Sequence, residues 1–156
     1  MNVLITLLTV LFLANPVAPN TDSEIKTTQE NNTITEVVIE SNDKMRFNLK
    51  EIKVKAGTTV KLTLKHVGKL PKQAMGHNFV LLKQGVELRD FAMEATKFKA
   101  NDYIPENTND TIAYTDLIGG GESTTIEFEA PEKGTYTFLC SFPGHFGLMK
   151  GTFVVE

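Results

Sequence analysis

The chain has 156 residues, of which 41% are hydrophobic and 22% charged, a composition typical of one soluble globular domain with a short appendage. A net charge of −3 and the lack of any run of Lys and Arg give no reason to expect binding to nucleic acid. The single cysteine, Cys140, excludes an intramolecular disulfide, and a lone thiol is by default a small buried hydrophobe.

The chain begins with an apolar leader, residues 1–18, that carries no charged side chain. Its apolar run, Val3 to Ala14, is well short of the roughly 20 residues that span a bilayer, and it has the length of the hydrophobic region of a signal peptide. We therefore expect an exported, periplasmic protein with no stable membrane span. No Lys or Arg precedes the run and no clean small-x-small cleavage site follows it, so an uncleaved hydrophobic tail or a buried first strand stays open.

Residues 19–33 are polar and predict a solvated linker, followed by a folded domain over residues 34–156. In this domain apolar and polar residues alternate in runs that predict strands with one buried face, and these runs include Met45–Leu49, Val60–Leu64, Ile126–Phe128 and Tyr136–Cys140. Apolar residues between Val86 and Lys99 recur every three or four positions, which predicts a short helix. The pattern indicates an all-β, Greek-key antiparallel β-sandwich with one short helical insertion.

The segment most informative about function runs from Cys140 to Met149 and reads Cys-Ser-Phe-Pro-Gly-His-Phe-Gly-Leu-Met. It places a thiol, the imidazole of His145 and a thioether between two strand-like runs, in a Cys-x4-His-x3-Met spacing. Pro143 and Gly144 make the chain turn, so the three side chains can converge on one point. A thiolate, two imidazoles and a long axial thioether form the trigonal site of blue copper proteins, whereas structural zinc sites do not use methionine.

The loop supplies one of the two histidines that such a site needs, and the remaining candidates are His66 and His77. Gly76 precedes His77 and lets the backbone approach a metal closely, just before an apolar run. His66 ends a predicted strand and has no glycine directly beside it. We therefore predict that His77 is the second imidazole ligand and that His66 has a structural role.

The motif Gly76-His77-Asn78, followed at a distance by Cys-x4-His-x3-Met, resembles the azurin family of cupredoxins. The resemblance runs from about residue 34 to the end of the chain. It includes Ser-Asn-Asp-Lys-Met-Arg-Phe-Asn at 41–48, the segment 68–78 and Leu-Ile-Gly at 117–119. The interval between the cysteine and the loop histidine is longer than in plastocyanin-like sites.

This resemblance implies one copper ion, whose ligands match His77, Cys140, His145 and Met149, the last as a weak axial ligand. The carbonyl of Gly76 matches the opposite axial contact, and Asn78 matches the residue that connects the ligand loops. The implied function is a soluble type 1 (blue) copper electron carrier. It would be a monomer that shuttles single electrons between redox proteins such as c-type cytochromes or a copper-containing reductase.

Three features depart from the family pattern. The two cysteines of the disulfide that azurins usually carry near the N-terminus are absent. Phe79 stands where many azurins have a buried indole, and Phe146 stands beside His145 where a small polar residue is common. None of these departures removes a ligand.

The residues around His145 also predict a docking surface for redox partners. If the two ligand turns meet at one end of the sandwich, they surround the edge of this histidine with an apolar patch, made of Met75, Phe142, Pro143, Phe146, Gly147 and Leu148. An apolar patch on a soluble monomer usually marks a docking site, and brief electron-transfer encounters need only a small one. The alternative is that Phe142 and Leu148 belong to the core.

Other functions make different demands on these residues. In a Cys/His enzyme, Cys140 would be a nucleophile activated by a histidine, and in a copper chaperone or store the same ligands would not need a fixed trigonal geometry. A multicopper oxidase or nitrite reductase would need a second histidine cluster, and the three histidines of the chain leave none for it. We expect a carrier and not an enzyme, with an intense blue colour that a cysteine hydrolase would lack.

Overall fold

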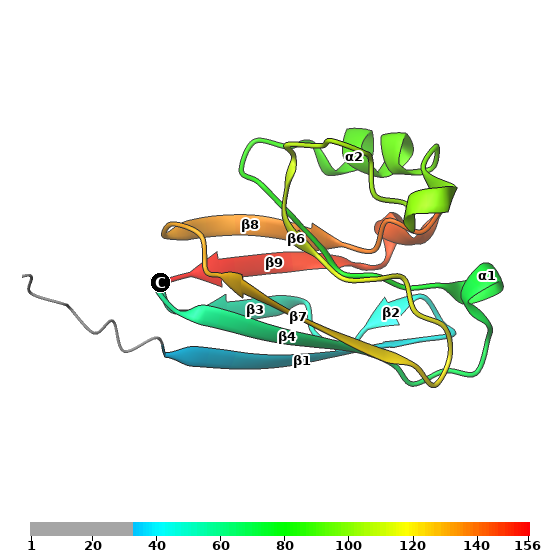
Figure 1. Ribbon diagram of the computed structural model, residues 1–156, viewed down its shortest axis with the longest axis horizontal. Coiled ribbons are helices and arrows are strands. Elements are labelled where there is room, and N and C mark those ends of the chain that lie inside the picture. Colours follow the sequence, from blue (N-terminus) through cyan, green and yellow to red (C-terminus); the bar gives the residue numbers. More distant parts are fainter. Residues whose placement is uncertain (1–32) are drawn as a thin grey trace, which may run out of the picture. The chain divides into compact units, whose positions relative to one another are not determined.

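Two β-sheets face each other in the computed structural model, which describes residues 33–156 (Figure 1). The leader and all but the last residue of the predicted linker lie outside the described residues, and so does the expected signal peptide. The domain boundary at residue 34 therefore stays a prediction. No helix in the described part of the chain is long and apolar enough to cross a membrane.

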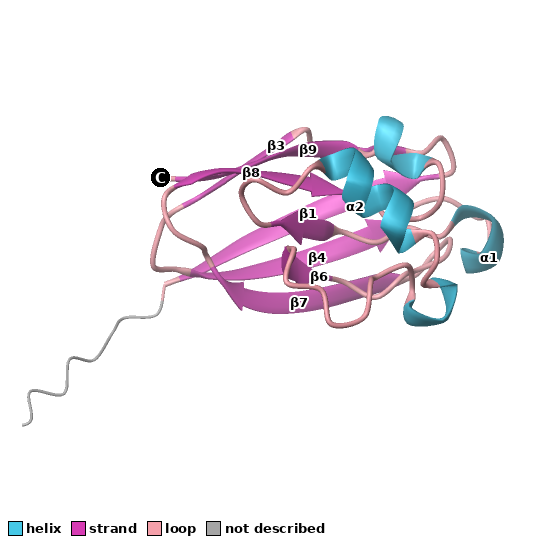
Figure 2. Cartoon of the chain, turned by 90° about the horizontal axis from the view of Figure 1, so that it is seen from above, coloured by secondary structure: helices cyan, strands magenta, loops and turns pink. Residues whose placement is uncertain are grey.

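The chain crosses between the two sheets several times. One sheet has the order β2 (Arg46–Phe47), β1 (Ile34–Asn42), β4 (Thr59–His66) and β7 (Ser123–Glu129). The other has the order β3 (Glu51–Val54), β9 (Lys150–Val155), β8 (Gly134–Leu139), β5 (Val80–Leu82) and β6 (Thr111–Tyr114). Figure 2 shows the two layers from above, with the helices gathered toward one end.

The predicted β-sandwich is confirmed, but its sheets are mixed and not purely antiparallel. Strand β1 runs parallel to β4, from Ile34 opposite Thr59 to Ser41 opposite His66, and β3 runs parallel to β9. The β1–β4 pair is parallel because the chain crosses to the other sheet as β3 before it returns. The period-2 pattern indicates which face of a strand is buried, but it carries no information about strand direction.

The strand predicted over Met45–Leu49 is shorter in the structure. Only Arg46 and Phe47 pair, antiparallel to the end of β1. Met45 has φ 53°, in the left-handed region, so the chain is not extended at the first residue of the predicted run. The alternation is still meaningful, because Phe47 is buried against the core.

The predicted helix is present as α2 (Leu88–Ala95), which buries Phe91, Ala92 and Ala95. A second short helix, α1 (Lys72–Met75), and two 3-10 turns, η1 (Lys99–Asn101) and η2 (His145–Gly147), were not predicted. They are too short for a helical period to show in the sequence.

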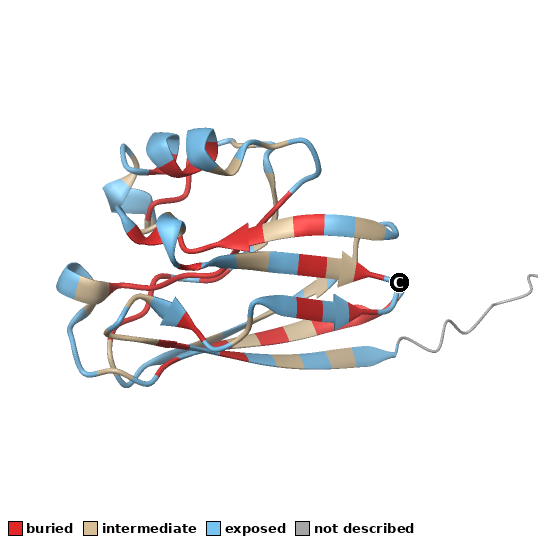
Figure 3. Cartoon of the chain, turned by 180° about the vertical axis from the view of Figure 1, so that it is seen from behind, coloured by how far each residue is buried: buried red, intermediate tan, exposed pale blue. Residues whose placement is uncertain are grey.

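The main core fills the space between the sheets, and Figure 3 shows buried residues interspersed with exposed ones along the strands. Phe138 lies at its centre, with its ring 5.2 Å from that of Phe79 and 5.8 Å from that of Phe47. Strand β5 is buried throughout, since its other face packs under α2. Strand β5 pairs antiparallel with β8, with Val80 opposite Leu139, and this register positions the site described next.

Candidate metal centre

The predicted ligands come from separate parts of the chain and meet at one end of the sandwich. His77 precedes β5 and Cys140 follows β8, and because these strands are antiparallel neighbours, the start of one lies beside the end of the other. His145 begins the turn η2, and Met149 directly precedes β9. The loop after β8 therefore brings three of the predicted residues back to the fourth.

Three donor atoms converge there. The ligand atoms of His77, Cys140 and His145 all lie within 4.8 Å of one another, and the three residues are buried. The Cys140 Sγ is 3.6 Å from Nδ1 of His145 and 3.9 Å from Nδ1 of His77. For metal bonds of about 2.0 Å to nitrogen and about 2.3 Å to sulfur, donors at 120° lie about 3.7 Å apart. The spacing thus fits one ion in a trigonal site.

The ring of His77 is oriented by a hydrogen bond on its far side. Its Nε2 lies 2.9 Å from the carbonyl oxygen of Asn42, at the end of β1, and a carbonyl can only accept. The proton is therefore on Nε2, and the lone pair on Nδ1 faces the thiol. Asn42 belongs to the 41–48 motif, but the motif alone does not predict this contact.

His66 is not among the clustered donors, in agreement with its predicted structural role. Its ring stacks on that of His77 at a centroid distance of 4.5 Å. Both of its ring nitrogens are occupied: the N–H of Gly68 donates to Nδ1 and the carbonyl of Met75 accepts from Nε2, each at 3.0 Å. His66 therefore supports the ligand ring from behind.

The thiol of Cys140 is fully buried, and burial raises its pKa to about 12. Backbone N–H groups of Asn78 and Phe142 donate toward the sulfur and partly oppose this rise. Their donation is suited to a thiolate, since a negative sulfur is the stronger acceptor. The carbonyl oxygen of Gly76 lies 4.0 Å from the same sulfur.

The two histidines are neutral in the metal-free protein at neutral pH. Burial lowers the pKa of His77 to about 4, partly opposed by the Asn42 carbonyl, and burial likewise lowers the pKa of His145 to about 4. Two neutral imidazoles and one thiol that ionises on metal binding are the donor set of a type 1 copper site.

Met149 completes the predicted set and is fully buried. Its N–H donates to the carbonyl of His145 at 2.8 Å, and its own carbonyl accepts from the N–H of Cys140 at 2.9 Å. The ligand loop is thereby closed on itself. Gly144, at φ 84°, occupies the left-handed region that lets the loop turn into η2.

Asn78 forms hydrogen bonds between the two ligand segments. Its Oδ1 accepts from the N–H of Ser141 at 2.9 Å, and its Nδ2 donates to the Ser141 hydroxyl at 2.8 Å. The same amide group donates to the carbonyl of Asp102 at 3.1 Å. Ser141, which directly follows the thiol ligand, was not identified from the sequence.

Glycine is required before His77. A Cβ atom on Gly76 would lie 2.6 Å from the carbonyl oxygen of Lys72 and 2.9 Å from Cδ2 of Leu117. The residue has an ordinary φ of −67°, so the requirement comes from close packing and not from backbone strain. Any larger side chain would push α1 away from the site.

The residues of the predicted docking patch lie at this end of the sandwich, with different exposures. Leu148 is 43% exposed, Pro143 and Gly147 are exposed, and Met75 and Phe146 are half-buried. Phe142 packs between Tyr103 and His145, at centroid distances of 5.2 Å and 4.6 Å, so it belongs partly to the core. Leu70, just before α1, is a further exposed apolar residue, at 42%, that was not predicted because it stands in a polar segment.

Comparison with known proteins supports the site. Residues 33–156 match the family of copper binding proteins of the plastocyanin/azurin family. The chain is 45% identical over 124 residues to azurin of Alcaligenes faecalis, which covers 75% of this chain and 94% of that protein. It is 39% identical over 128 residues to azurin of Pseudomonas fluorescens biotype C, covering 77% of this chain and 97% of that protein.

Solved structures agree with the sequence relatives. An azurin from Methylomonas sp. strain J superposes with a TM-score of 0.71 at 35% identity, covering 78% of this chain and 97% of that one. Reduced auracyanin from Roseiflexus castenholzii gives a TM-score of 0.70 at 34% identity, covering 80% and 97%. The chain therefore belongs to the plastocyanin/azurin family of copper-binding proteins, as an azurin-type cupredoxin that holds one copper ion and carries electrons.

Proposed function

We propose that the copper ion is bound by Nδ1 of His77, Sγ of Cys140 and Nδ1 of His145, with Met149 as the weak axial ligand and the Gly76 carbonyl opposite it. The observation that carries this assignment is the convergence of the three donor atoms within 4.8 Å of one another. Bound copper supplies a one-electron couple, and a mixed thiolate and imidazole site suits both of its oxidation states.

The chain's own residues hold this site in place before any metal binds. Asn42 orients the His77 ring, Asn78 holds the segment that follows the thiol, and the loop hydrogen bonds of His145 fix the position of Met149. A site that needs little rearrangement favours rapid electron exchange. A copper chaperone, which must release its ion to another protein, has no use for such rigidity.

We further propose that the protein is exported to the periplasm, as expected from residues 1–18, with residues 19–33 as a linker. There it would exchange electrons with c-type cytochromes or a copper-containing reductase, as a monomer and without catalysing a reaction of its own. The apolar patch around His145 would be the docking surface, because the exposed Pro143 and Leu148 stand on either side of this ligand in its loop.

The test is purification of the full chain, followed by metal analysis, visible absorption and one-electron titration. A stoichiometry of one copper per chain with an intense blue band that bleaches on reduction supports the proposal. A colourless protein that binds copper would favour storage or transport of the ion, and a protein that takes up no copper would contradict the assignment. The mass of the protein recovered from the periplasm reports whether the leader is removed.

A further inference from the structure

Three cationic residues are connected to predicted copper ligands through a neighbouring residue or backbone group. We call them the basic edge: Arg46, Lys50 and Lys150. Arg46 pairs in the β1–β2 ladder with Asn42, whose carbonyl binds His77. The Lys50 ammonium donates to the carbonyls of residues 148 and 150, at 2.7 Å and 3.4 Å, on either side of Met149. Lys150 directly follows that ligand.

No carboxylate among residues 33–156 forms an ion pair with the basic edge. The lysines in ion pairs among residues 33–156 are Lys53, Lys61, Lys72 and Lys97. Arg46, Lys50 and Lys150 are in none of these pairs, and all three are exposed. Partial burial and then repulsion from Arg46 and Lys150 lower the pKa of Lys50, so the three charges are near enough to disfavour one another.

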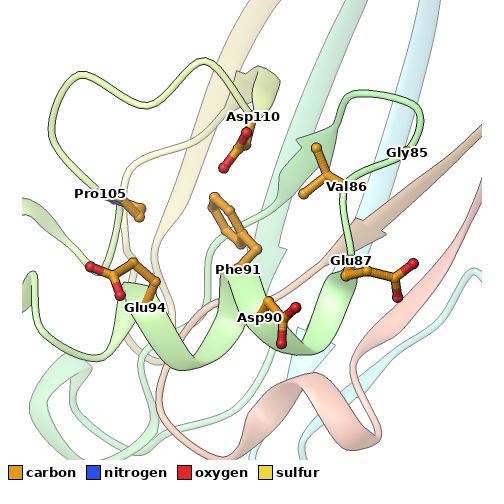
Figure 4. Close-up of a pocket in the computed structure, with 8 residues that line it drawn as sticks. All are labelled: Gly85, Val86, Glu87, Asp90, Phe91, Glu94, Pro105 and Asp110. Atoms are coloured by element: carbon orange, nitrogen blue, oxygen red, sulfur yellow. The ribbon is translucent and has the colours of Figure 1, made fainter.

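The region around α2, by contrast, carries charges of both signs. Around α2, the carboxylates of Glu87, Asp90, Glu94 and Asp110 surround a cleft of about 490 Å³ beside Phe91 (Figure 4). Helix α2 contacts the turn η2 that begins at His145. In Figure 1, α2 lies above β8 and β9, whereas β2, which carries Arg46, lies below them. The cations of the basic edge thus have no ion-pair partner among residues 33–156, whereas at α2 Lys97 pairs with Glu94 and Arg89 stands on the same helix.

We propose that the basic edge binds the carboxylate-rich rim of a protein electron-transfer partner and so orients that partner over the loop of His145. This proposal rests on the electron-carrier function argued above. Mutual repulsion among three unpaired cations is relieved when carboxylates approach them. Charges at the rim of a small interface act mainly on the rate and orientation of encounter, while the apolar patch supplies the contact.

The experiment measures reduction of the copper-loaded full chain by two small haem proteins in stopped flow. Ferrocytochrome b5 presents an acidic haem edge and ferrocytochrome c a basic one. In each case one electron leaves the haem iron, Fe(II) becoming Fe(III), and reduces Cu(II) to Cu(I). With the acidic donor we expect a second-order rate constant that falls as salt is added, and a decrease of about threefold at low salt in each of Arg46→Gln and Lys150→Gln. Lys50 is left unchanged because it also bonds the ligand loop.

Lys133→Gln is the matched control. Lys133 is exposed and directly precedes β8, at the end of the sandwich away from the ligand loop. The substitution therefore removes one positive charge, as the other two do, but leaves the basic edge intact. Its rate with cytochrome b5 should stay near that of the unmodified protein. With cytochrome c, the Arg46 and Lys150 variants should be unchanged or faster, and all variants should keep the blue band.

Hexaammineruthenium(II), a small reductant that needs no docking site, distinguishes failure of the docking proposal from failure of the carrier function. If it reduces the protein but the rate with cytochrome b5 is independent of salt, or falls equally in the Lys133 variant, the basic edge is not a docking site and the carrier function stands. If it reduces none of the copper-loaded variants, the carrier function itself is wrong.

Discussion

His77 donates a hydrogen bond through Nε2 to the carbonyl oxygen of Asn42 over 2.9 Å, and this contact joins the end of β1 in one sheet to the segment that leads into β5 in the other. The ligand ring is therefore oriented by the packing of the two sheets. Its second face stacks on His66, which is itself held at both ring nitrogens. The imidazole is consequently positioned for a metal by the folded chain alone.

Replacing the thiol should remove the blue colour without unfolding the domain. Cys140→Ser exchanges the only sulfur that can form a thiolate for a hydroxyl of similar size in a fully buried position. We expect loss of the intense thiolate-to-copper band, with far-ultraviolet circular dichroism unchanged. A variant that kept the band would show that the sulfur is not a ligand.

Met149→Leu should be milder. The side chain is fully buried, and a swap that conserves volume costs less than about 1.5 kcal/mol of stability. Loss of the weak axial donor should leave copper bound and raise the reduction potential, because the electron-poorer site favours Cu(I). Voltammetry measures the potential. Met93→Leu, at an exposed position of α2, is the control that should leave it unchanged.

Asn78→Ala should loosen the thiol segment. It leaves the buried N–H of Ser141 without its acceptor, at a cost of about 1–3 kcal/mol. We expect a lower melting temperature and faster loss of copper to a chelator. Asn48→Ala removes a comparable acceptor, which binds the N–H of Glu40 in an exposed position, and should retain copper as the unmodified protein does. Equal rates of copper loss in the two variants would contradict the role of Asn78.

The metal-free protein should lose stability as the pH falls from about 6.5 to about 4. Burial lowers the pKa of His77 and His145 to about 4, whereas an unfolded chain has histidines near 6.5. The unfolded state then binds more protons than the folded state in this window. The contribution of the two neutral histidines to the free energy of unfolding is therefore present above about pH 6.5 and is lost as the pH falls through about 4. Each histidine contributes at most about 3 kcal/mol.

Urea unfolding of the metal-free protein at about pH 7 and about pH 4.5 measures this loss. In His145→Gln, the free energy of unfolding should depend on pH roughly half as strongly, because only one of the two histidines with a lowered pKa remains. A urea midpoint that does not change with pH, or that changes equally in the variant, would rule out the histidine pair as the source.

A charge in the apolar patch should slow electron exchange and spare the copper site. Leu148 is 43% exposed beside Met149, so Leu148→Glu places a carboxylate in the predicted contact without disturbing the core. We expect a slower rate with a redox partner and a nearly unchanged absorption spectrum. Val38→Glu, at a position of β1 that is 47% exposed, is the matched control. If both variants exchange electrons as fast as the unmodified protein, the electron leaves by another route.

The amino-acid sequence by itself determined the residue types of the site and their local spacing. Cys140, His145 and Met149 share one loop, and Pro143 and Gly144 make that loop turn, so their convergence could be predicted from chain geometry. Alternation in β4 and β8 likewise identified the buried faces, because burial follows the period of the strand.

Only the tertiary structure decided which groups from distant segments support the ligands. The parallel pairing of β1 with β4 places Asn42 behind His77, and the pairing of β5 with β8 places Asn78 beside Ser141. The same packing brings the Lys50 ammonium to the carbonyl of Leu148, 98 residues further along the chain. Such contacts depend on strand order and direction, which a pattern of apolar and polar residues does not specify, since either direction buries the same side chains.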